Sequence, residues 1–230
     1  MTDLNALPGL FIVLEGPDGA GKSVQARRLA ERLEAHGLPV TYTREPGGTP
    51  LGEQVRKILL DPSEVARGPV ADALLFNAAR SQLLLDVIMP ALRRGDIVVL
   101  DRYATSTMAY QGYGSGVDRE MLATIQKLAT GGLMPDLVVV LDVPGEVGLA
   151  RRDAGHVDEL TRFEDESRHD LAFHQRVREG YHQMAAADPD HWVVLDGSGD
   201  IDEVAEDVSR VVDAVLLRSG IRAAPGEGER

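Results

Sequence analysis

The sequence of 230 residues contains no cysteine, which excludes disulfides and thiolate metal sites. Lysine is also scarce: only three of the 24 basic residues are lysines, and they face 37 acidic residues. The formal net charge of −13 opposes nonspecific binding to nucleic acid or to anionic membranes. No apolar run is long enough for a signal sequence or a membrane span. We therefore expect a cytoplasmic protein with neither nucleic acid nor membrane as a partner.

One of the three lysines, Lys22, belongs to a P-loop with the spacing G-x-x-x-x-G-K-[ST]. In such a loop the backbone N–H groups surround nucleotide phosphates, the lysine reaches the outer phosphates, and the serine hydroxyl helps to hold Mg²⁺. An apolar run precedes the loop and a helical pattern follows it, a context that disfavours a mere glycine-rich turn. The loop, and thus the predicted ATP site, consists of Gly16, Pro17, Asp18, Gly19, Ala20, Gly21, Lys22 and Ser23.

Five short apolar runs alternate with helical patterns along the chain. The runs are typical of strands buried on both faces of a parallel sheet, and they cover residues 10–14, 39–43, 97–100, 137–141 and 192–195. Helices are predicted from 21 to a stop at 37 and over 51–60, 70–92, 118–130, 145–151, 170–187 and 201–215. This alternation predicts a doubly wound α/β fold of the P-loop NTPase type, with ligands at the carboxyl ends of the strands. The strand order stays open.

We expect one domain over residues 1–230, with its core at about 10–217. Glycines at 112, 114 and 116 predict a loop before the helix at 118–130, and Pro90 is expected to kink the helix at 70–92. The polar segment at about 151–168 predicts a lid, and residues from about 221 to 230 predict a disordered tail.

Four charged residues each follow a predicted strand, the position where a doubly wound fold builds its site. They are Glu15, Arg44, Asp101 and Asp142.

Several stretches beyond the P-loop resemble the thymidylate kinase family in order and spacing, from about residue 10 to 217. They are residues 11–16 (FIVLEG), 43–49 (TREPGGT), 101–103 (DRY) and 106–112 (STMAYQG). The resemblance implies a bacterial-type nucleoside monophosphate kinase with a mobile lid. It also implies transfer of the γ-phosphoryl group of ATP to dTMP in dTTP synthesis, with Mg²⁺ as cofactor and a homodimer as the assembly.

The resemblance gives roles to the residues around the phosphates. Lys22 and the loop N–H groups hold the donor phosphates, and Ser23 helps to hold Mg²⁺. Asp18 faces the sugar and metal region of the acceptor, although an aspartate that stabilises the loop locally is the alternative. Arg102 contacts the acceptor phosphate, because its planar guanidinium matches two phosphate oxygens.

Two further charged residues keep two interpretations each. Asp101 either orients Arg102 or binds metal-bound water. Arg44 is either a second phosphate clamp or the salt-bridge partner of Glu45, its neighbour in sequence.

The family places its thymine-binding pair on the long helix, at Phe76 and Arg80. The two residues are four apart and share one helix face, so the ring can stack on a pyrimidine while the guanidinium bonds a carbonyl. Taken alone, such residues are usually a core phenylalanine and a solvated arginine. The resemblance adds Thr107 and Gln111 as polar groups near the base, and Tyr110 as a ring that crowds a 2′-hydroxyl.

Some family members place a catalytic arginine in the P-loop, at the position of Gly19. Because this sequence has glycine at that position, the catalytic cation must come from elsewhere. We favour Arg152, with Arg151 beside it and Arg162 at the return of the lid. The alternative is that these are surface arginines kept for solubility.

Other functions stay open. One is a related kinase for another (deoxy)nucleotide or a deoxynucleoside. Another is a non-catalytic P-loop switch protein, which would need no acceptor pocket, and a third is an inactive paralogue.

Overall fold

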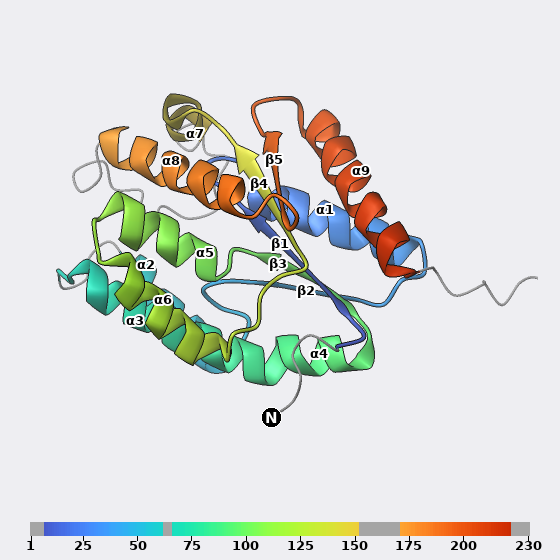
Figure 1. Cartoon of the computed structure of the whole chain (residues 1–230), viewed down its shortest axis with the longest axis horizontal. Helices are drawn as coiled ribbons and strands as arrows, with labels where there is room; N and C mark the ends of the chain where they lie inside the picture. The colour runs from blue at the N-terminus through green and yellow to red at the C-terminus, as the bar shows by residue number, and fades with distance from the viewer. Residues whose placement is uncertain (1–6, 62–65, 152–170, 222–230) are drawn as a thin grey trace, which may run out of the picture.

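A parallel five-stranded sheet forms the centre of the computed structural model, which describes residues 7–61, 66–151 and 171–221 (Figure 1). Every neighbouring pair of strands is parallel. The strands lie in the order β2 (Val40–Arg44), β3 (Ile97–Asp101), β1 (Leu10–Glu15), β4 (Leu137–Asp142) and β5 (Trp192–Asp196). The predicted fold class is confirmed, and the structure adds the strand order that the sequence left open.

Helices cover both faces of this sheet (Figure 1). The α-helices are α1 (Lys22–Ala35), α2 (Pro50–Leu60), α3 (Pro69–Leu83), α4 (Met89–Arg94), α5 (Ala104–Thr107), α6 (Arg119–Thr130), α7 (Gly145–Arg151), α8 (Leu171–Ala187) and α9 (Ile201–Ser219). Among the described residues, two segments are π-helical, η2 (Leu84–Ile88) and η3 (Met108–Gly114). No helix within the described ranges is both long and apolar enough to cross a membrane.

The alternation of side chains along β1 explains why two separate cores form. Leu10, Ile12 and Leu14 pack with α1 and α9 on one face of the sheet. Phe11 and Val13 point the other way and pack with η2 and α4. Because β1 is buried on both faces, it reads as a continuous apolar run, as predicted.

The structure refines the predicted long helix and corrects the predicted loop after it. Helix α3 continues through η2 into α4, and the π-helical turn lies directly before Pro90, which occupies the first turn of α4. The glycines at 112 and 114, predicted as loop, are helical within η3. A Cβ on Gly114 would lie 2.5 Å from the Phe173 ring of α8, so this glycine permits close helix packing. The predicted lid beyond 151 and the tail from 222 lie outside the described residues.

Candidate active site

Most of the predicted site residues line one cavity of about 1010 Å³, where the carboxyl ends of β1, β2 and β3 meet. The predicted residues that line it are Asp18, Gly19, Ala20, Gly21, Lys22, Ser23, Arg44, Phe76, Arg80, Asp101, Arg102, Thr107, Tyr110, Gln111 and Arg151. Gly16 and Pro17 contribute backbone carbonyls, which accept hydrogen bonds from Arg102 and Lys22. The P-loop therefore shares its space with the residues predicted to bind the acceptor.

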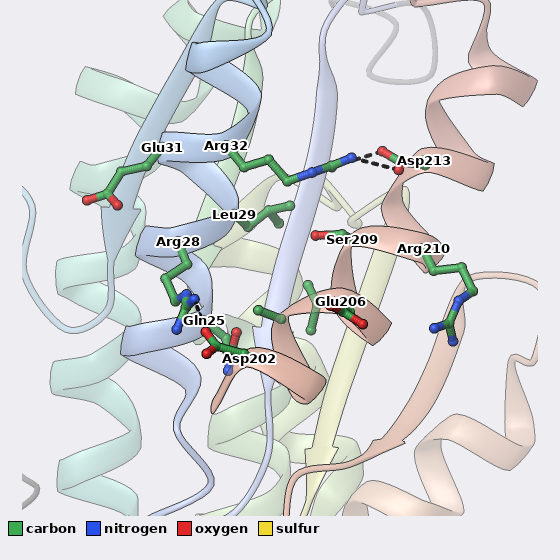
Figure 2. Close-up of a pocket in the computed structure, with 12 residues that line it drawn as sticks. Gln25, Arg28, Leu29, Glu31, Arg32, Asp202, Glu206, Ser209, Arg210 and Asp213 are labelled. Carbon is green, nitrogen blue, oxygen red and sulfur yellow. Dashed lines mark hydrogen bonds and ion pairs between the residues drawn. The ribbon is translucent and has the colours of Figure 1, made fainter. Parts of the chain in front are cut away.

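A second cavity of about 890 Å³ lies between α1 and α9 and contains none of the predicted residues (Figure 2). Two ion pairs bridge these helices: Arg28 with Asp202, and Arg32 with Asp213. Exposed ion pairs of this kind contribute little, and the helices beneath them are joined by the apolar core. We therefore place the candidate site in the first cavity.

The P-loop adopts a backbone that excludes a side chain at Gly19. This residue has φ +72°, and a Cβ there would lie 2.2 Å from the carbonyl oxygen of Gly148 in α7. The contact is reciprocal, because a Cβ on Gly148 would lie 2.3 Å from the carbonyl oxygen of Asp18. An arginine at position 19 is thus incompatible with this packing of α7 on the loop.

Lys22 opens α1 and points back into the P-loop. Its buried ammonium group donates to the carbonyl oxygen of Pro17 at 2.6 Å. Burial, together with the positive charge of Arg102, lowers the pKa of Lys22 to about 8, against the opposing effect of Asp18. A bound phosphate would supply the negative charge that this ammonium group needs, which suits the role predicted for it.

Arg102 lines the cavity and makes several hydrogen bonds there. Its guanidinium donates to Asp18 Oδ1 at 2.5 Å, to Ser106 Oγ at 3.2 Å and to the Tyr110 hydroxyl at 3.3 Å. Its backbone has φ +68°, a left-handed conformation that costs on the order of 1–3 kcal/mol for a residue other than glycine. Burial raises the pKa of Asp18, but the charges of Arg102 and Lys22 outweigh that effect and lower it overall. The carboxylate therefore stays ionised beside the arginine.

The residues predicted to hold Mg²⁺ have oxygen atoms in positions that suit this ion. Ser23 Oγ donates to Asp101 Oδ2 at 2.5 Å, so the hydroxyl and the carboxylate lie together. Asp101 Oδ1 and Asp18 Oδ2 are buried and have no hydrogen-bond partner among the described residues. Unpaired carboxylate oxygens suit a hard cation and its bound water. The described residues contain no group of three or more histidines, aspartates or glutamates that could hold a metal ion by themselves.

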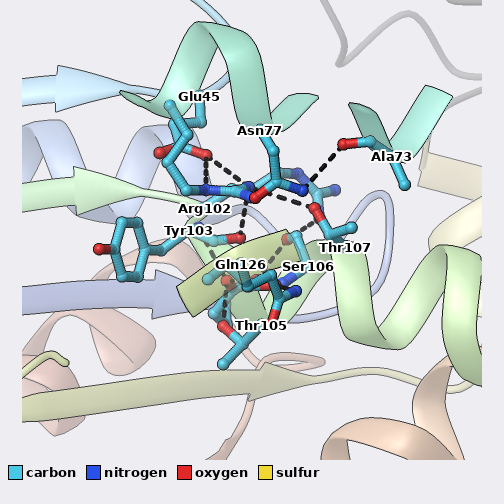
Figure 3. A network of polar contacts seen from close by, with 12 residues as sticks. Glu45, Ala73, Asn77, Arg102, Tyr103, Thr105, Ser106, Thr107 and Gln126 are labelled. Carbon is cyan, nitrogen blue, oxygen red and sulfur yellow. Dashed lines mark hydrogen bonds and ion pairs between the residues drawn. The ribbon is translucent and has the colours of Figure 1, made fainter. Parts of the chain in front are cut away.

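Figure 3 shows a polar network that includes Glu45, Asn77 and Thr107. Arg80, which also lines the cavity, is buried and hydrogen-bonds to all three. The Arg80 guanidinium, 1% exposed, contacts Glu45 Oε2 at 2.7 and 2.8 Å, and donates to Asn77 at 2.9 Å. It also donates to Thr107 Oγ1 at 3.2 Å and to the carbonyl oxygen of Tyr103 at 3.1 Å. Burial raises the pKa of Glu45 to about 7, although Arg80 lowers it. Arg80 is therefore fixed, and it is not the solvated helix arginine of the alternative.

This network corrects one of the two interpretations of Arg44. Glu45 pairs with Arg80, and Arg44 pairs instead with Glu53 at 3.4 Å near the surface. Arg44 is the last residue of β2 and Glu45 follows the strand, and the two side chains form ion pairs with different helices, α2 and α3. Arg44 remains on the cavity wall, as a phosphate clamp requires.

The remaining acceptor residues surround this network. Phe76 is half-buried and lines the cavity one helical turn before Arg80. Gln111 and Tyr110 are buried in η3, and the Tyr110 ring lies 5.1 Å from the guanidinium carbon of Arg102. A π-helical segment at this position is in keeping with the frequent use of such turns at functional sites.

Two predicted residues have other contacts. Asp142 does not join the cavity: α8 covers its end of the sheet, and both its oxygens accept from Arg178 at 2.7 Å. Burial raises the pKa of Asp142, but Arg178 and His182 lower it overall. The Arg151 guanidinium donates to the carbonyl oxygens of residues 197 and 198, each at 2.7 Å, in the loop after β5. Arg152 and Arg162 lie outside the described residues.

Two glutamates, Glu15 and Glu45, are buried beside the site, which the sequence did not predict. The sequence places Glu15 after a predicted strand and offers Glu45 as a salt-bridge partner for Arg44, and it gives neither residue a further role. Both are buried at or just after the carboxyl ends of strands, where a carboxylate needs a compensating partner. The sequence shows only their position just after an apolar run, and the structure adds their burial.

A phosphate-binding loop that shares one cavity with an arginine-lined pocket is the arrangement of a nucleotide kinase, which must hold a phosphoryl donor and an acceptor together. Comparison with known proteins narrows this class. A family model described as thymidylate kinase matches residues 14–208. The chain therefore belongs to the thymidylate kinase family.

Three relatives named thymidylate kinase are similar to this chain over nearly their whole length. The protein from Roseiflexus sp. (strain RS-1) is 46% identical over 90% of this chain and 95% of the relative. The protein from Thermomicrobium roseum is 50% identical, over 90% and 96% respectively. The protein from Pseudomonas putida (strain GB-1) is 46% identical, over 92% and 99%. These similarities confirm the resemblance noted in the sequence.

Proposed function

We propose that this chain is an enzyme that transfers the γ-phosphoryl group of ATP to dTMP, giving dTDP and ADP for dTTP synthesis. The observation that carries the proposal is the single cavity that joins the P-loop to the pocket of Phe76, Arg80 and Thr107. A switch protein needs the loop alone, whereas a kinase needs both ends. The names of the relatives support dTMP as the acceptor.

In this proposal Arg80 recognises the thymine base by a hydrogen bond. The Glu45 and Asn77 contacts fix the guanidinium, so an N–H group can meet a thymine carbonyl without a further loss of side-chain entropy. Phe76 stacks on the pyrimidine from the preceding helical turn, while Thr107 and Gln111 supply polar groups near its edge. Tyr110 is held by Arg102, so its ring would crowd a 2′-hydroxyl and favour a deoxynucleotide.

The acceptor phosphate needs cationic side chains that position it more than it needs a general base to accept a proton. A phosphate oxygen is already an anionic nucleophile at neutral pH, so the protein supplies position and positive charge. Arg102 is the first clamp, oriented by Asp18, and Arg44 is the second. Lys22 and the loop N–H groups hold the donor phosphates in line with this nucleophile.

Ser23 and Asp101 would hold Mg²⁺ beside the donor phosphates, since their side chains already touch and Asp101 keeps an unpaired oxygen. When bound, Mg²⁺ supplies charge neutralisation on the phosphate oxygens. The last cation for the transferred group is proposed to be Arg152, with Arg151 and Arg162 as its alternatives.

We further propose a cytoplasmic homodimer. Large apolar side chains are exposed on α2, α3, η2 and α6 and just after α6: Leu51, Ile58, Val70, Leu74, Leu85, Met121, Leu128 and Met134. Helix α3 contacts both α2 and α6, and the three lie side by side in Figure 1. A second copy of the chain would cover these side chains. Light scattering of Leu128→Asp against the unaltered chain tests this surface.

An ADP-release assay over a panel of acceptors tests the proposed reaction. We expect the largest kcat/KM for dTMP, a lower value for dUMP, which lacks the 5-methyl group, and little turnover of ribonucleotides or of deoxythymidine. Turnover of dTMP no better than that of the other monophosphates would refute the thymidylate assignment. Binding of ATP without turnover of any acceptor would favour the switch protein.

A further inference from the structure

Glu15, at the end of β1, is a fully buried carboxylate that the proposed reaction leaves without a role. It accepts five hydrogen bonds at 2.5–3.1 Å: from the N–H groups of Tyr103 and Ser106 and from the hydroxyls of Thr105, Ser106 and Tyr181. An ionised carboxylate has about four acceptor sites, so nothing remains for a substrate or metal. Glu15 therefore acts through other residues.

Two of those donors, Tyr103 and Ser106, connect Glu15 to Arg102. The N–H group of Tyr103, directly after Arg102, donates to Glu15 Oε1 at 2.9 Å and fixes the turn that follows the strained residue. The Ser106 hydroxyl donates to Glu15 Oε2 at 2.6 Å and accepts from the Arg102 guanidinium at 3.2 Å. Glu15 thus holds both the backbone and the side chain of Arg102.

The fifth donor comes from a distant helix. Tyr181 of α8 is fully buried, and its hydroxyl donates to Glu15 Oε2 at 2.8 Å. All five hydrogen-bond donors of Glu15 are neutral, and no ion pair within the described residues includes it, although Lys22 interacts with it electrostatically. Burying a carboxylate costs free energy unless it is well hydrogen-bonded. A residue that served only to fill the core would be uncharged.

We propose that Glu15 is a positioning residue that holds Arg102 in the conformation that binds the acceptor phosphate, and that Tyr181 secures the Glu15 carboxylate for this task. The inference rests on the proposed role of Arg102. It predicts that loss of the Glu15 charge weakens the use of dTMP much more than the use of ATP, because the hydrogen bonds of the Glu15 side chain go to residues 103, 105, 106 and 181 and not to the P-loop.

Steady-state kinetics of Glu15→Gln and Tyr181→Phe test this, with Tyr113→Phe as the matched control. Tyr113 lies on η3, packs against Gly180 of α8, and is outside the cavity. In Glu15→Gln we expect KM for dTMP to rise, with kcat/KM falling about tenfold or more, the factor for one hydrogen bond to a charged group. KM for ATP should stay within about twofold. Tyr181→Phe should show the same split to a smaller degree, and Tyr113→Phe should behave as the unaltered enzyme.

The double variant separates positioning from stability. The Tyr181 hydroxyl contacts both Glu15 and Ser106 Oγ, and these two are hydrogen-bonded to each other, so Glu15→Gln with Tyr181→Phe should lose less than the sum of the two single losses. A purely structural role would lower kcat through a smaller folded fraction and leave KM for dTMP unchanged, and that result would overturn the inference. If Glu15→Gln does not fold, an unchanged KM for dTMP in Tyr181→Phe overturns it equally. Failure of the unaltered chain to phosphorylate dTMP would instead refute the proposed function.

Discussion

Replacing Glu45 by glutamine tests whether burial or the attraction of Arg80 dominates the energy of this carboxylate. The substitution keeps the shape of the side chain and one acceptor oxygen, but it removes the charge. Burial raises the pKa of Glu45 from 4.5 to about 7. The folded state therefore holds an extra proton between these two values, and stability from this group is greatest below pH 4.5 and falls as the pH rises to about 7.

The size of the effect follows from the shift in pKa. One pKa unit corresponds to about 1.4 kcal/mol, so the charged carboxylate destabilises the folded state by up to about 3 kcal/mol above pH 7. The glutamine variant lacks this penalty. Its advantage in the free energy of unfolding should therefore grow from about 1 kcal/mol at pH 5.5 to about 3 kcal/mol at pH 8.

Urea unfolding between pH 5.5 and 8.5, followed by the fluorescence of the single tryptophan, Trp192, measures this difference. Glu53→Gln is the control, because it removes an exposed carboxylate that also pairs with an arginine. The raised pKa of His191, due to its hydrogen bond with Asp188, affects both proteins alike and cancels in the comparison. If the attraction of Arg80 dominated instead, Glu45→Gln would be destabilised at pH 8 by a few kcal/mol, and the reasoning would be wrong.

Three predictions concern the cations of the reaction. Lys22→Ala should lower kcat by roughly 10²–10³-fold or more, with Lys127→Ala, on the exposed face of α6, as a control in the ADP-release assay. In the unaltered enzyme, ATP binding should weaken as the pH rises through about 8, where the ammonium group of Lys22 loses its proton; titration calorimetry measures it. Arg152→Ala should lower kcat far more than it weakens ATP binding, whereas Arg210→Ala should change neither. A normal kcat in Arg152→Ala would move the role to Arg151 or Arg162.

The features that the sequence predicted well are those with local causes. Strands buried on both faces appear as apolar runs, and the P-loop spacing is fixed by the backbone that must surround a phosphate. Phe76 and Arg80 share a cavity because a four-residue spacing places them on one helix face. None of these inferences needed a partner from a distant part of the chain.

The errors arose where a distant element decides. Glu45 and Arg80 are separated by 35 residues, so their pairing depends on how α3 packs against the end of β2. Asp142 follows a strand as the site residues do, but α8 supplies Arg178 and His182 to it. The glycines of η3 look like loop residues, because local rules do not show that the Phe173 ring needs the space.

The missing P-loop arginine also acquires a physical explanation. Gly19 and Gly148 exclude side chains from each other's backbone, so α7 can lie directly against the loop only because both residues are glycine. An arginine at position 19 would force α7 away. Helix α7 ends at Arg151, beside the cavity, and the chain continues at once into Arg152. The packing that excludes an arginine from the loop accompanies the placement of Arg151, the last described residue of α7, on the wall of the cavity. In the proposed mechanism, a P-loop arginine and a docked α7 would therefore be alternative ways to supply the same charge.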